Sequence, residues 1–346
     1  MKKLLTYENY VVALMALIFG CIFFDRLALN FLIPYVAKDL QLSDTQIGLL
    51  AGALSFAWAI SSYTTTAFAE AKNAKRIIFL LGVLVFSICS FGSGLANGFI
   101  VLLLARLVMG MAEGPVIPLA QSFVEKESSP NRLGMNAGIL QAVGSALCGS
   151  ILAPVILVQI AEKMGWREAF FIAGTPGIIL GFIAYFTLKS NTTDNTETKV
   201  VQEAGISELL KYKNVRKSMG IACAIFGWWF ATLPFITKYF VEVQGMSGDE
   251  MGKTMGLLGV SGLLSAVIVP TLSDKFGRRK ILLIFVLIGV FYPICVQFLT
   301  GSALHLPAMF ITYFMMGTMP IAARSESNVT SRTSMPSIVT RPSETS

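Results

Sequence analysis

Long apolar segments constrain this chain more than any other feature of its sequence. Ten such segments can be placed, at about 10–34, 45–69, 76–96, 98–121, 133–160, 167–188, 216–241, 250–270, 280–300 and 306–321. A helix of about 20 residues crosses the roughly 30 Å hydrocarbon core of a bilayer, and in lipid every backbone amide must find its partner within the helix. The sequence therefore predicts an all-α polytopic membrane protein with about ten transmembrane helices.

Composition and charge agree with this fold class. Only 14% of the 346 residues are charged, whereas soluble domains carry about 25%. The net charge of +7 comes from basic residues in short loops between apolar segments, so it gives no reason to expect nucleic acid as a partner. If the N-terminus is cytoplasmic, the loops across the membrane hold few basic residues, namely Lys38, Lys163, Arg167, Lys238 and Lys253. The positive-inside rule therefore predicts a multi-pass protein of the cell inner (plasma) membrane, embedded in lipid, with a cytoplasmic N-terminus.

A polar segment separates six apolar segments from four. We expect residues 1–188 to form an N-terminal six-helix bundle, 189–215 a cytoplasmic central loop, 216–321 an incomplete C-terminal helix bundle and 322–346 a Ser/Thr-rich tail that is non-native or disordered. The loop AEAKNAKR after the second segment and the loop SDKFGRRK after the eighth place their acids, Glu70 and Asp274, 204 residues apart. Parallel six-helix repeats are the plan of one large transporter class. Two further helices are therefore expected beyond residue 321, unless the tail is a natural disordered end.

The second of these loops has side chains suited to a tight turn at the inner membrane face. Gly277 permits a turn with positive φ, and Arg278 and Arg279 supply the positive charge of a cytoplasmic loop. Asp274 can offer its carboxylate to the N-terminus of a neighbouring helix. In the first loop Asn73 stands at the glycine position, and Asn tolerates the same backbone region. Two copies of the pattern favour a conformational motif over a generic basic loop.

Charged residues inside the apolar segments mark a candidate site. Asp25 and Arg26 lie in the first segment, and Arg106 and Glu113 lie in the fourth. A charge at the bilayer centre costs roughly 2.5–3.5 kcal/mol, so such residues usually face a cavity and pair. Asp25 and Arg106 lie at a similar depth, about 12–13 Å below the outer face. We expect Asp25 to pair with Arg106, which leaves Arg26 free to face a central cavity, although purely structural ion pairs are the alternative.

The sequences around these charges resemble a known family. The runs FFDRLALNFLIP in the first segment and RLVMGMAEGPVIP in the fourth, with the paired inner loops, resemble the anion:cation symporter branch of the major facilitator superfamily. That branch includes hexuronate, galactonate, phthalate and sialin-like transporters. The resemblance implies a major facilitator fold, with about ten transmembrane helices present of an expected twelve. It also implies that Arg26 binds the substrate carboxylate and that Asp25 and Glu113 exchange protons, with Arg106 in the same proton-coupling group.

The second segment departs from the pattern of that branch. The branch usually has a tyrosine followed by Gln, Pro and Gly, and this chain has Trp58 in the place of the tyrosine. The replacement leaves the substrate open, because a ring without a hydroxyl stands where a sugar-contacting one is expected. We expect Trp58 and Gln141, a polar residue in the middle of the fifth segment, to contact the substrate.

The sequence contains no motif that favours an enzyme. The 346 residues contain no Gly-x-x-x-x-Gly-Lys phosphate loop, no His/Cys/Asp metal cluster and no hydrolase nucleophile elbow. We therefore expect no catalytic residue, no metal and no cofactor.

Proton-coupled symport of a small organic anion by a monomer is the function that fits these patterns best. One alternative is a truncated membrane protein that transports nothing. Because alternating access needs both halves of the fold, we expect the 346 residues as given to be unable to catalyse uptake. A lesser alternative is an organophosphate antiporter. That family uses arginines in helices 1 and 7, whereas the seventh segment offers only Lys238 near its outer end.

Overall fold

A computed structural model of the chain describes residues 6–189, 213–298 and 304–318. The expected central loop 189–215 lies almost wholly outside these residues, and the expected tail 322–346 lies wholly outside them. Every regular element within them is helical, which confirms the predicted all-α class. The elements are α1 (Tyr7–Asp39), α2 (Asp44–Ala71), α3 (Lys75–Gly94), α4 (Phe99–Glu127), α5 (Leu133–Gln141), the π-helix η1 (Ala142–Leu152), α6 (Ala153–Lys163), α7 (Trp166–Thr187), α9 (Lys213–Glu242), α10 (Gly248–Phe276), α11 (Arg278–Val290), α12 (Tyr292–Phe298), α13 (His305–Thr312) and the 3₁₀-helix η2 (Tyr313–Thr318).

Most of the described helices are each long enough to cross a membrane once. Within the described residues, eight helical spans are long and apolar enough to do so, when α5–η1–α6 and α11–α12 each count as one span. The 30-residue helix α9 covers the seventh predicted segment. The shorter apolar helix His305–Met316 covers most of the tenth. The prediction of a polytopic helical membrane protein is therefore confirmed.

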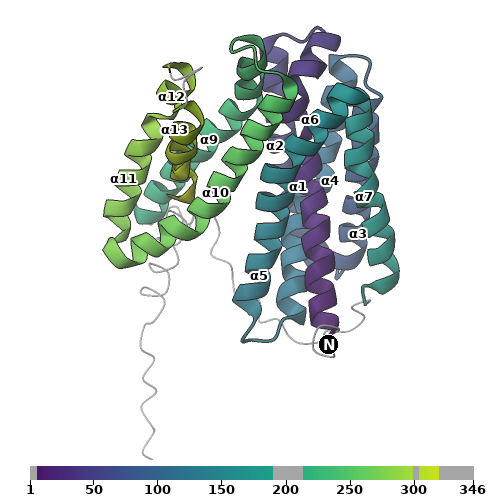
Figure 1. The fold of residues 1–346 in the computed structure, drawn as a ribbon. Coiled ribbons are helices and arrows are strands. Elements are labelled where there is room, and N and C mark those ends of the chain that lie inside the picture. Colours follow the sequence, from purple (N-terminus) through teal and green to yellow (C-terminus); the bar gives the residue numbers. More distant parts are fainter. Residues whose placement is uncertain (1–5, 190–212, 299–303, 319–346) are drawn as a thin grey trace, which may run out of the picture.

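Two helices begin at capping boxes on the same end of the molecule. At the start of α2 the Ser43 hydroxyl accepts a hydrogen bond from the backbone amide of Gln46, and the Gln46 side-chain oxygen accepts one from the backbone amide of Ser43. Ser247 and Glu250 form the same arrangement at the start of α10. Each box satisfies two backbone amides that the first turn of a helix would leave unpaired. We call this end, which holds residues 40–43, 164–165 and 243–247 and is uppermost in Figure 1, the upper end.

The ninth predicted segment, 280–300, is two helices rather than one. The break between α11 and α12 falls at Phe291, two residues before Pro293. Proline has no backbone N–H, and its ring clashes with the carbonyl four residues earlier. The amide of Cys295 resumes helical bonding by donating to the Phe291 carbonyl at 2.9 Å.

The fifth predicted segment, 133–160, keeps its direction but changes its winding. The middle of the segment, η1, is an 11-residue π-helix. The Ser150 hydroxyl donates to the Ser145 carbonyl, five residues earlier, at 3.0 Å. π-Helical stretches are rare and are often found at functional sites. Here η1, like α6 after it, packs against both α1 and α10.

The helices form two groups, which meet where α9 contacts α1 and α2 and where α10 contacts η1 and α6 (Figure 1). In the first group α4 packs between α2 and α3, α7 packs on α3, and α1 contacts α4, α5, η1, α6 and α7. In the second group α10 packs on α11 and η2, and α12 and α13 lie together. From the first group, α1 and α2 reach α9, and η1 and α6 reach α10. Toward the lower end α10 and α11 diverge from α5 (Figure 1).

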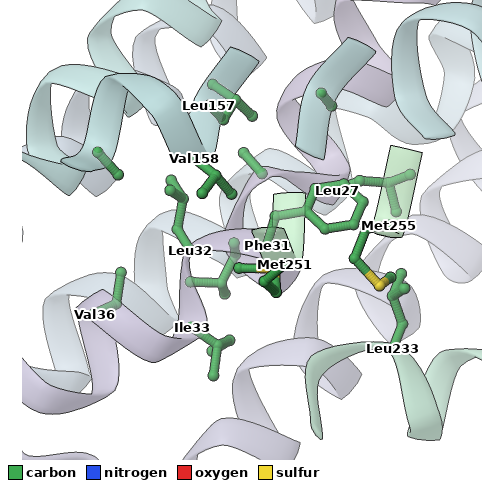
Figure 2. Close-up of a cluster of buried hydrophobic side chains, with 14 of the residues drawn as sticks. Leu27, Phe31, Leu32, Ile33, Val36, Leu157, Val158, Leu233, Met251 and Met255 are labelled. Atoms are coloured by element: carbon green, nitrogen blue, oxygen red, sulfur yellow. The ribbon is translucent and has the colours of Figure 1, made fainter. Parts of the chain in front are cut away.

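Apolar side chains seal the two groups together near the upper end. Figure 2 shows this buried cluster, in which side chains of α1 are surrounded by those of α6, α9 and α10. Its labelled members are Leu27, Phe31, Leu32, Ile33, Val36, Leu157, Val158, Leu233, Met251 and Met255. Burial of each such side chain contributes about 1.5–3 kcal/mol where water is the alternative. Contact between the groups is therefore strong in the upper half.

Polar contacts also join the two groups at the upper end. Lys238 of α9 forms an ion pair with Asp44 of α2 at 2.5 Å. The backbone amide of Asp249, in the first turn of α10, donates to Glu162 Oε1 of α6 at 3.1 Å. A carboxylate at a helix N-terminus also interacts favourably with the helix dipole.

One glycine allows α10 to approach η1 backbone to backbone. A Cβ atom added at Gly259 would lie 2.2 Å from the carbonyl oxygen of Ser150. Any other residue would force the two helices apart, because small residues are what permit such close crossings. The closed upper half therefore depends on glycine at this position.

Candidate functional site

Four ionisable side chains meet inside the first helix group. Asp25 and Arg26 come from the middle of α1, and Arg106 and Glu113 come from α4, which packs beside it. Asp25, Arg106 and Glu113 are fully buried, and Arg26 is 7% exposed. Buried charges in a membrane protein are costly and usually face a partner or a cavity. We call these four residues the charge cluster and treat it as the candidate site.

A close helix crossing holds α4 in position for this cluster. A Cβ atom added at Gly114, next to Glu113, would lie 2.6 Å from the backbone nitrogen of Ser62 in α2. The Ser61 hydroxyl also donates to the carbonyl of Met111 at 2.5 Å. This contact between α2 and α4 fixes the rotation of α4, and the side chain of Glu113 lies beside Arg26 of α1.

Arg26 lies beside a carboxylate, contrary to the expectation that it would have none. Its Nη1 is 3.8 Å from Glu113 Oε2. Its guanidinium carbon is also 4.7 Å from the ring centroid of Trp58, a cation–π contact. Such a contact contributes about 0.5–2 kcal/mol, more where water is excluded. Arg26, Glu113 and Trp58 are thus brought together.

Asp25 accepts a hydrogen bond from a serine instead of pairing with Arg106. The expected ion pair is absent, because no nitrogen of Arg106 lies within 4.0 Å of an Asp25 carboxylate oxygen. The Ser90 hydroxyl of α3 donates to Asp25 Oδ1 at 2.7 Å. Asp25 Oδ2 has no hydrogen-bond partner among the described residues. The two side chains are near enough to interact electrostatically, but their helices are rotated so that Ser90 satisfies the carboxylate.

Arg106 makes weak contacts for a buried cation. Its Nη1 donates to the sulfur of Met109 at 3.3 Å, and its guanidinium carbon is 4.9 Å from the ring centroid of Phe170. Its Nε and Nη2 atoms have no hydrogen-bond partner in the described part of the chain. Arg106 does interact electrostatically with Asp25 and Glu113 over a longer distance.

A small cavity adjoins the charge cluster. Its volume is about 20 Å³, which is room for about one water molecule. Arg26 and Arg106 contribute to its wall, and Phe230 of α9 contributes from the second group. The remaining lining residues are Leu27, Leu29, Asn30, Leu50, Ala51, Leu54 and Ser55. An organic anion would need the cavity to widen, and the wall contributed by α9 is the part that can move with the second group.

Gln141 is not brought to the charge cluster. It is the last residue of α5, is exposed, and its amide donates to the Ser145 hydroxyl at 3.4 Å. It is not part of the cavity wall among the described residues. Its depth along the segment was readable from the sequence, but its direction was not, because η1 begins at the next residue.

The two inner-loop motifs have the same backbone feature at the lower end. Asn73 has φ +50° and Gly277 has φ +95°. Glu70 forms an ion pair with Lys75 at 2.9 Å within its own loop. Asp274 and Arg279 are exposed, and the side chain of Arg278 lies outside the described part of the chain.

Sequence reasoning missed several residues of the site. Ser90, Asn30 and Ser55 are polar residues within apolar segments, and this signal could have singled them out. Phe230 carries no such signal, because an aromatic residue in an apolar segment is ordinary. No group of three or more His, Cys, Asp or Glu residues in the described part of the chain could hold a metal ion.

The chemistry available to the charge cluster is ionic. With all four groups ionised, two guanidinium groups balance two carboxylates. Guanidinium groups bind carboxylates and similar anions through two parallel hydrogen bonds, and a carboxylate can take up a proton. The cluster can therefore hold an anion and exchange protons, and these two abilities are coupled through charge.

Comparisons with known proteins place the chain in a family. Residues 15–338 match the model of the Major Facilitator Superfamily. The chain is 28% identical over 272 residues to a hexuronate transporter of Bacillus subtilis, an alignment that covers 75% of this chain and 63% of that transporter. It is 22% identical over 294 residues to a probable sulfoacetate transporter of Cupriavidus necator, covering 81% of this chain and 68% of the relative.

A solved structure shows the same fold. The crystal structure of a bacterial homolog of the human lysosomal transporter Spinster superposes with a TM-score of 0.75 and 22% identity, covering 95% of this chain and 78% of that one. In the alignment with the hexuronate transporter, the chain spans 63% of that protein's length, which is less than two thirds. The family and these relatives are membrane transporters rather than enzymes, as the sequence indicated, and they fit the anion:cation symporter branch. Because residues 15–338 match the family model and the fold is shared with a solved transporter, the chain belongs to the major facilitator superfamily.

Proposed function

We propose that this chain carries the substrate and proton sites of a transporter that moves a small organic anion together with protons. The observation that carries the proposal is the charge cluster, with two arginines in the wall of a buried cavity and two carboxylates beside them. The relatives named for hexuronate and sulfoacetate support an organic anion as the substrate class. Because the chain spans 63% of the hexuronate transporter, the activity of the whole protein is part of this proposal.

Coupling would arise from competition for Arg26. In the present arrangement Glu113 neutralises Arg26 at 3.8 Å. A proton on Glu113 removes that negative charge, and the guanidinium of Arg26 then becomes available to the anionic group of a substrate. Release of the proton on the other side restores the Arg26–Glu113 pair and expels the anion. Trp58, which lies against Arg26, would contact the rest of the substrate.

Access would alternate by separation of the two helix groups. The groups are closed by the apolar cluster and the Asp44–Lys238 ion pair at the upper end. We propose that the upper end faces outward and the N-terminus faces the cytoplasm, as the positive-inside rule requires. The arrangement then corresponds to an inward-directed state, and the exchange of closure from one end to the other would carry the substrate across.

Reconstituted uptake tests the proposal. If the chain transports as proposed, liposomes that contain it, with an acidic exterior, accumulate labelled glucuronate or sulfoacetate; this outcome would overturn the expectation from the sequence that the 346 residues as given cannot catalyse uptake. Glu113→Gln should exchange labelled anion at equal concentrations but not accumulate it, because the amide cannot carry the proton. Glu125→Gln is the matched control, since Glu125 is exposed on the same helix. Accumulation by Glu113→Gln at the level of the parent would remove Glu113 from the coupling step.

The second candidate, a membrane protein that does not transport, makes a different prediction. It is favoured by the size of the cavity, whose volume of about 20 Å³ leaves room for about one water molecule. In that case the purified chain binds one of the two labelled anions but shows no uptake above protein-free liposomes. The absence of both binding and uptake would reject the proposed substrate class altogether.

A further inference from the structure

Of the two arginines in the charge cluster, Arg106 alone has buried donor atoms without a hydrogen-bond partner within the described residues. It is fully buried, and its Nε and Nη2 atoms have no hydrogen-bond partner in the part of the chain that the structure describes. Its Nη1 donates to the Met109 sulfur at 3.3 Å, which is a weak acceptor. Unmet donors on a buried cation are costly. Such a group is expected to meet a strong acceptor at some stage of the functional cycle.

The unmet donors belong to a residue that faces the same cavity as Arg26. Arg26 reaches the cavity wall from α1 and Arg106 reaches it from α4, with the polar side chains of Asn30 and Ser55 in the same wall. Two guanidinium groups around one cavity suit a ligand with two anionic groups, because each guanidinium can form a bidentate pair.

Charge balance points the same way. When Asp25 and Glu113 each carry a proton, the charge cluster holds two positive charges and no negative one. A ligand with a single negative charge would leave one buried cation unbalanced, which is strongly unfavourable. A ligand with two negative charges restores neutrality.

We infer that the cavity takes an organic dianion, a dicarboxylate or a sulfocarboxylate, with one anionic group on Arg26 and the second on Arg106. This inference rests on the proposed function and narrows its substrate class. It gives Arg106 a binding role in place of the purely proton-coupling role that the sequence indicated.

Asp25 is the competing partner for Arg106. Its Oδ2 atom also has no hydrogen-bond partner in the described residues, so a small rotation would let the two side chains pair. If that pairing were the whole role of Arg106, removing either partner would have the same effect on anion binding. In the proposed arrangement the effects differ, because Asp25→Asn leaves the donors of Arg106 available to the ligand.

Matched ligand pairs test the inference on the purified full chain. Sulfoacetate is compared with 2-sulfoacetamide, and succinate with succinamate, by calorimetry in detergent at mildly acidic pH; each amide has nearly the size of its dianion but one charge fewer. The parent should bind at least one dianion about 10- to 100-fold more tightly than its amide, the range expected for a charged hydrogen-bonded pair. Arg106→Gln should reduce that ratio to near one and leave the affinity for the amide within a few fold.

Two further variants separate the possible causes. Arg167→Gln is the control, because Arg167 pairs with Asp39 at 2.6 Å at the upper end, away from the cavity. It should keep the preference of the parent. Asp25→Asn should keep that preference too, and it tests the inference even if Arg106→Gln does not fold. Loss of the preference in Asp25→Asn would overturn the inference.

The remaining outcomes distinguish this inference from the proposed function. Equal affinity of the parent for dianion and amide, or an unchanged ratio in Arg106→Gln, would overturn the dianion assignment while leaving anion transport intact. If the parent binds neither these ligands nor glucuronate, both the proposed function and the inference fail.

Discussion

Replacement of Gly259 by alanine should force open the upper closure between the two helix groups. The added Cβ atom would lie 2.2 Å from the Ser150 carbonyl oxygen and 2.6 Å from its carbon. Non-bonded atoms are most stable at about 3.5–4.0 Å, so the α10 backbone must move by roughly 1 Å. Overpacking of this kind costs about 1–3 kcal/mol. If that cost falls on the closed state alone, the open population rises by about 5- to 150-fold, since each 1.4 kcal/mol is a factor of ten.

Gly262→Ala is the matched control on the same helix. Its added Cβ atom would lie 3.6 Å from the ring of Tyr313, an ordinary contact. Both substitutions raise helix propensity by about 1 kcal/mol, so a difference between them reports the clash with η1.

Thiol labelling measures the opening. Leu233 of α9 is 6% exposed and belongs to the apolar cluster of Figure 2. In a background without the native cysteines, Leu233→Cys should react slowly with a membrane-impermeant maleimide added outside. We expect Gly259→Ala to speed labelling about 5-fold or more, from the cost given above, and Gly262→Ala to leave it unchanged. Equal rates in the two variants would refute the closure described here.

Three further predictions concern the binding residue, the surface ion pair and the topology. Arg26→Ala should abolish calorimetric binding of glucuronate while the protein still inserts and purifies as a folded species; unchanged affinity would sink the role of Arg26. Lys238→Gln removes the ion pair with Asp44, in which the Asp44 side chain is 70% exposed. Because exposed pairs contribute about 0–1 kcal/mol, it should change the labelling of Leu233→Cys far less than Gly259→Ala does. A protease-sensitive tag before Tyr7 should be cut only in inverted vesicles, and cleavage in intact cells would reverse the proposed orientation.

Much of the fold was predictable from the sequence because the bilayer leaves few choices. An apolar segment of about 20 residues that crosses a bilayer is expected to be helical, because a helix satisfies all the backbone hydrogen bonds within the segment itself. The break before Pro293 was not predicted, because a proline alone does not locate a break: Pro115 and Pro176 lie inside helices that continue past them. The π-helical winding of η1 was not predicted either, since no residue type demands it and its packing partners lie on α1 and α10.

The charge cluster shows where sequence reasoning stops. Positions along the sequence place Asp25 in α1 and Arg106 in α4, but they do not give the rotation of each helix. Adjacent residues on a helix point about 100° apart, so a modest rotation decides whether Arg26 meets a carboxylate. The rotation of α4 depends on tertiary contacts such as the one at Gly114, which no local pattern reveals.

Contacts between segments far apart in the chain could not be predicted from the sequence either. Glu162 accepts a hydrogen bond from the amide of Asp249, 87 residues away. Each residue alone reads as an exposed acid in a loop-proximal position. Only the packing of α10 against α6 makes them partners.

Proton uptake on anion binding tests the central claim most directly. The claim is that the charge cluster binds an anion when its carboxylates hold protons, so binding and protonation must be linked. The purified chain, in weakly buffered solution with a pH-sensitive dye, receives glucuronate or sulfoacetate at neutral pH. The account predicts that the solution becomes more alkaline as protein takes up protons, that affinity rises as pH falls, and that Glu113→Gln takes up fewer protons per anion bound. Saturable anion binding with no proton uptake and no dependence on pH would contradict it.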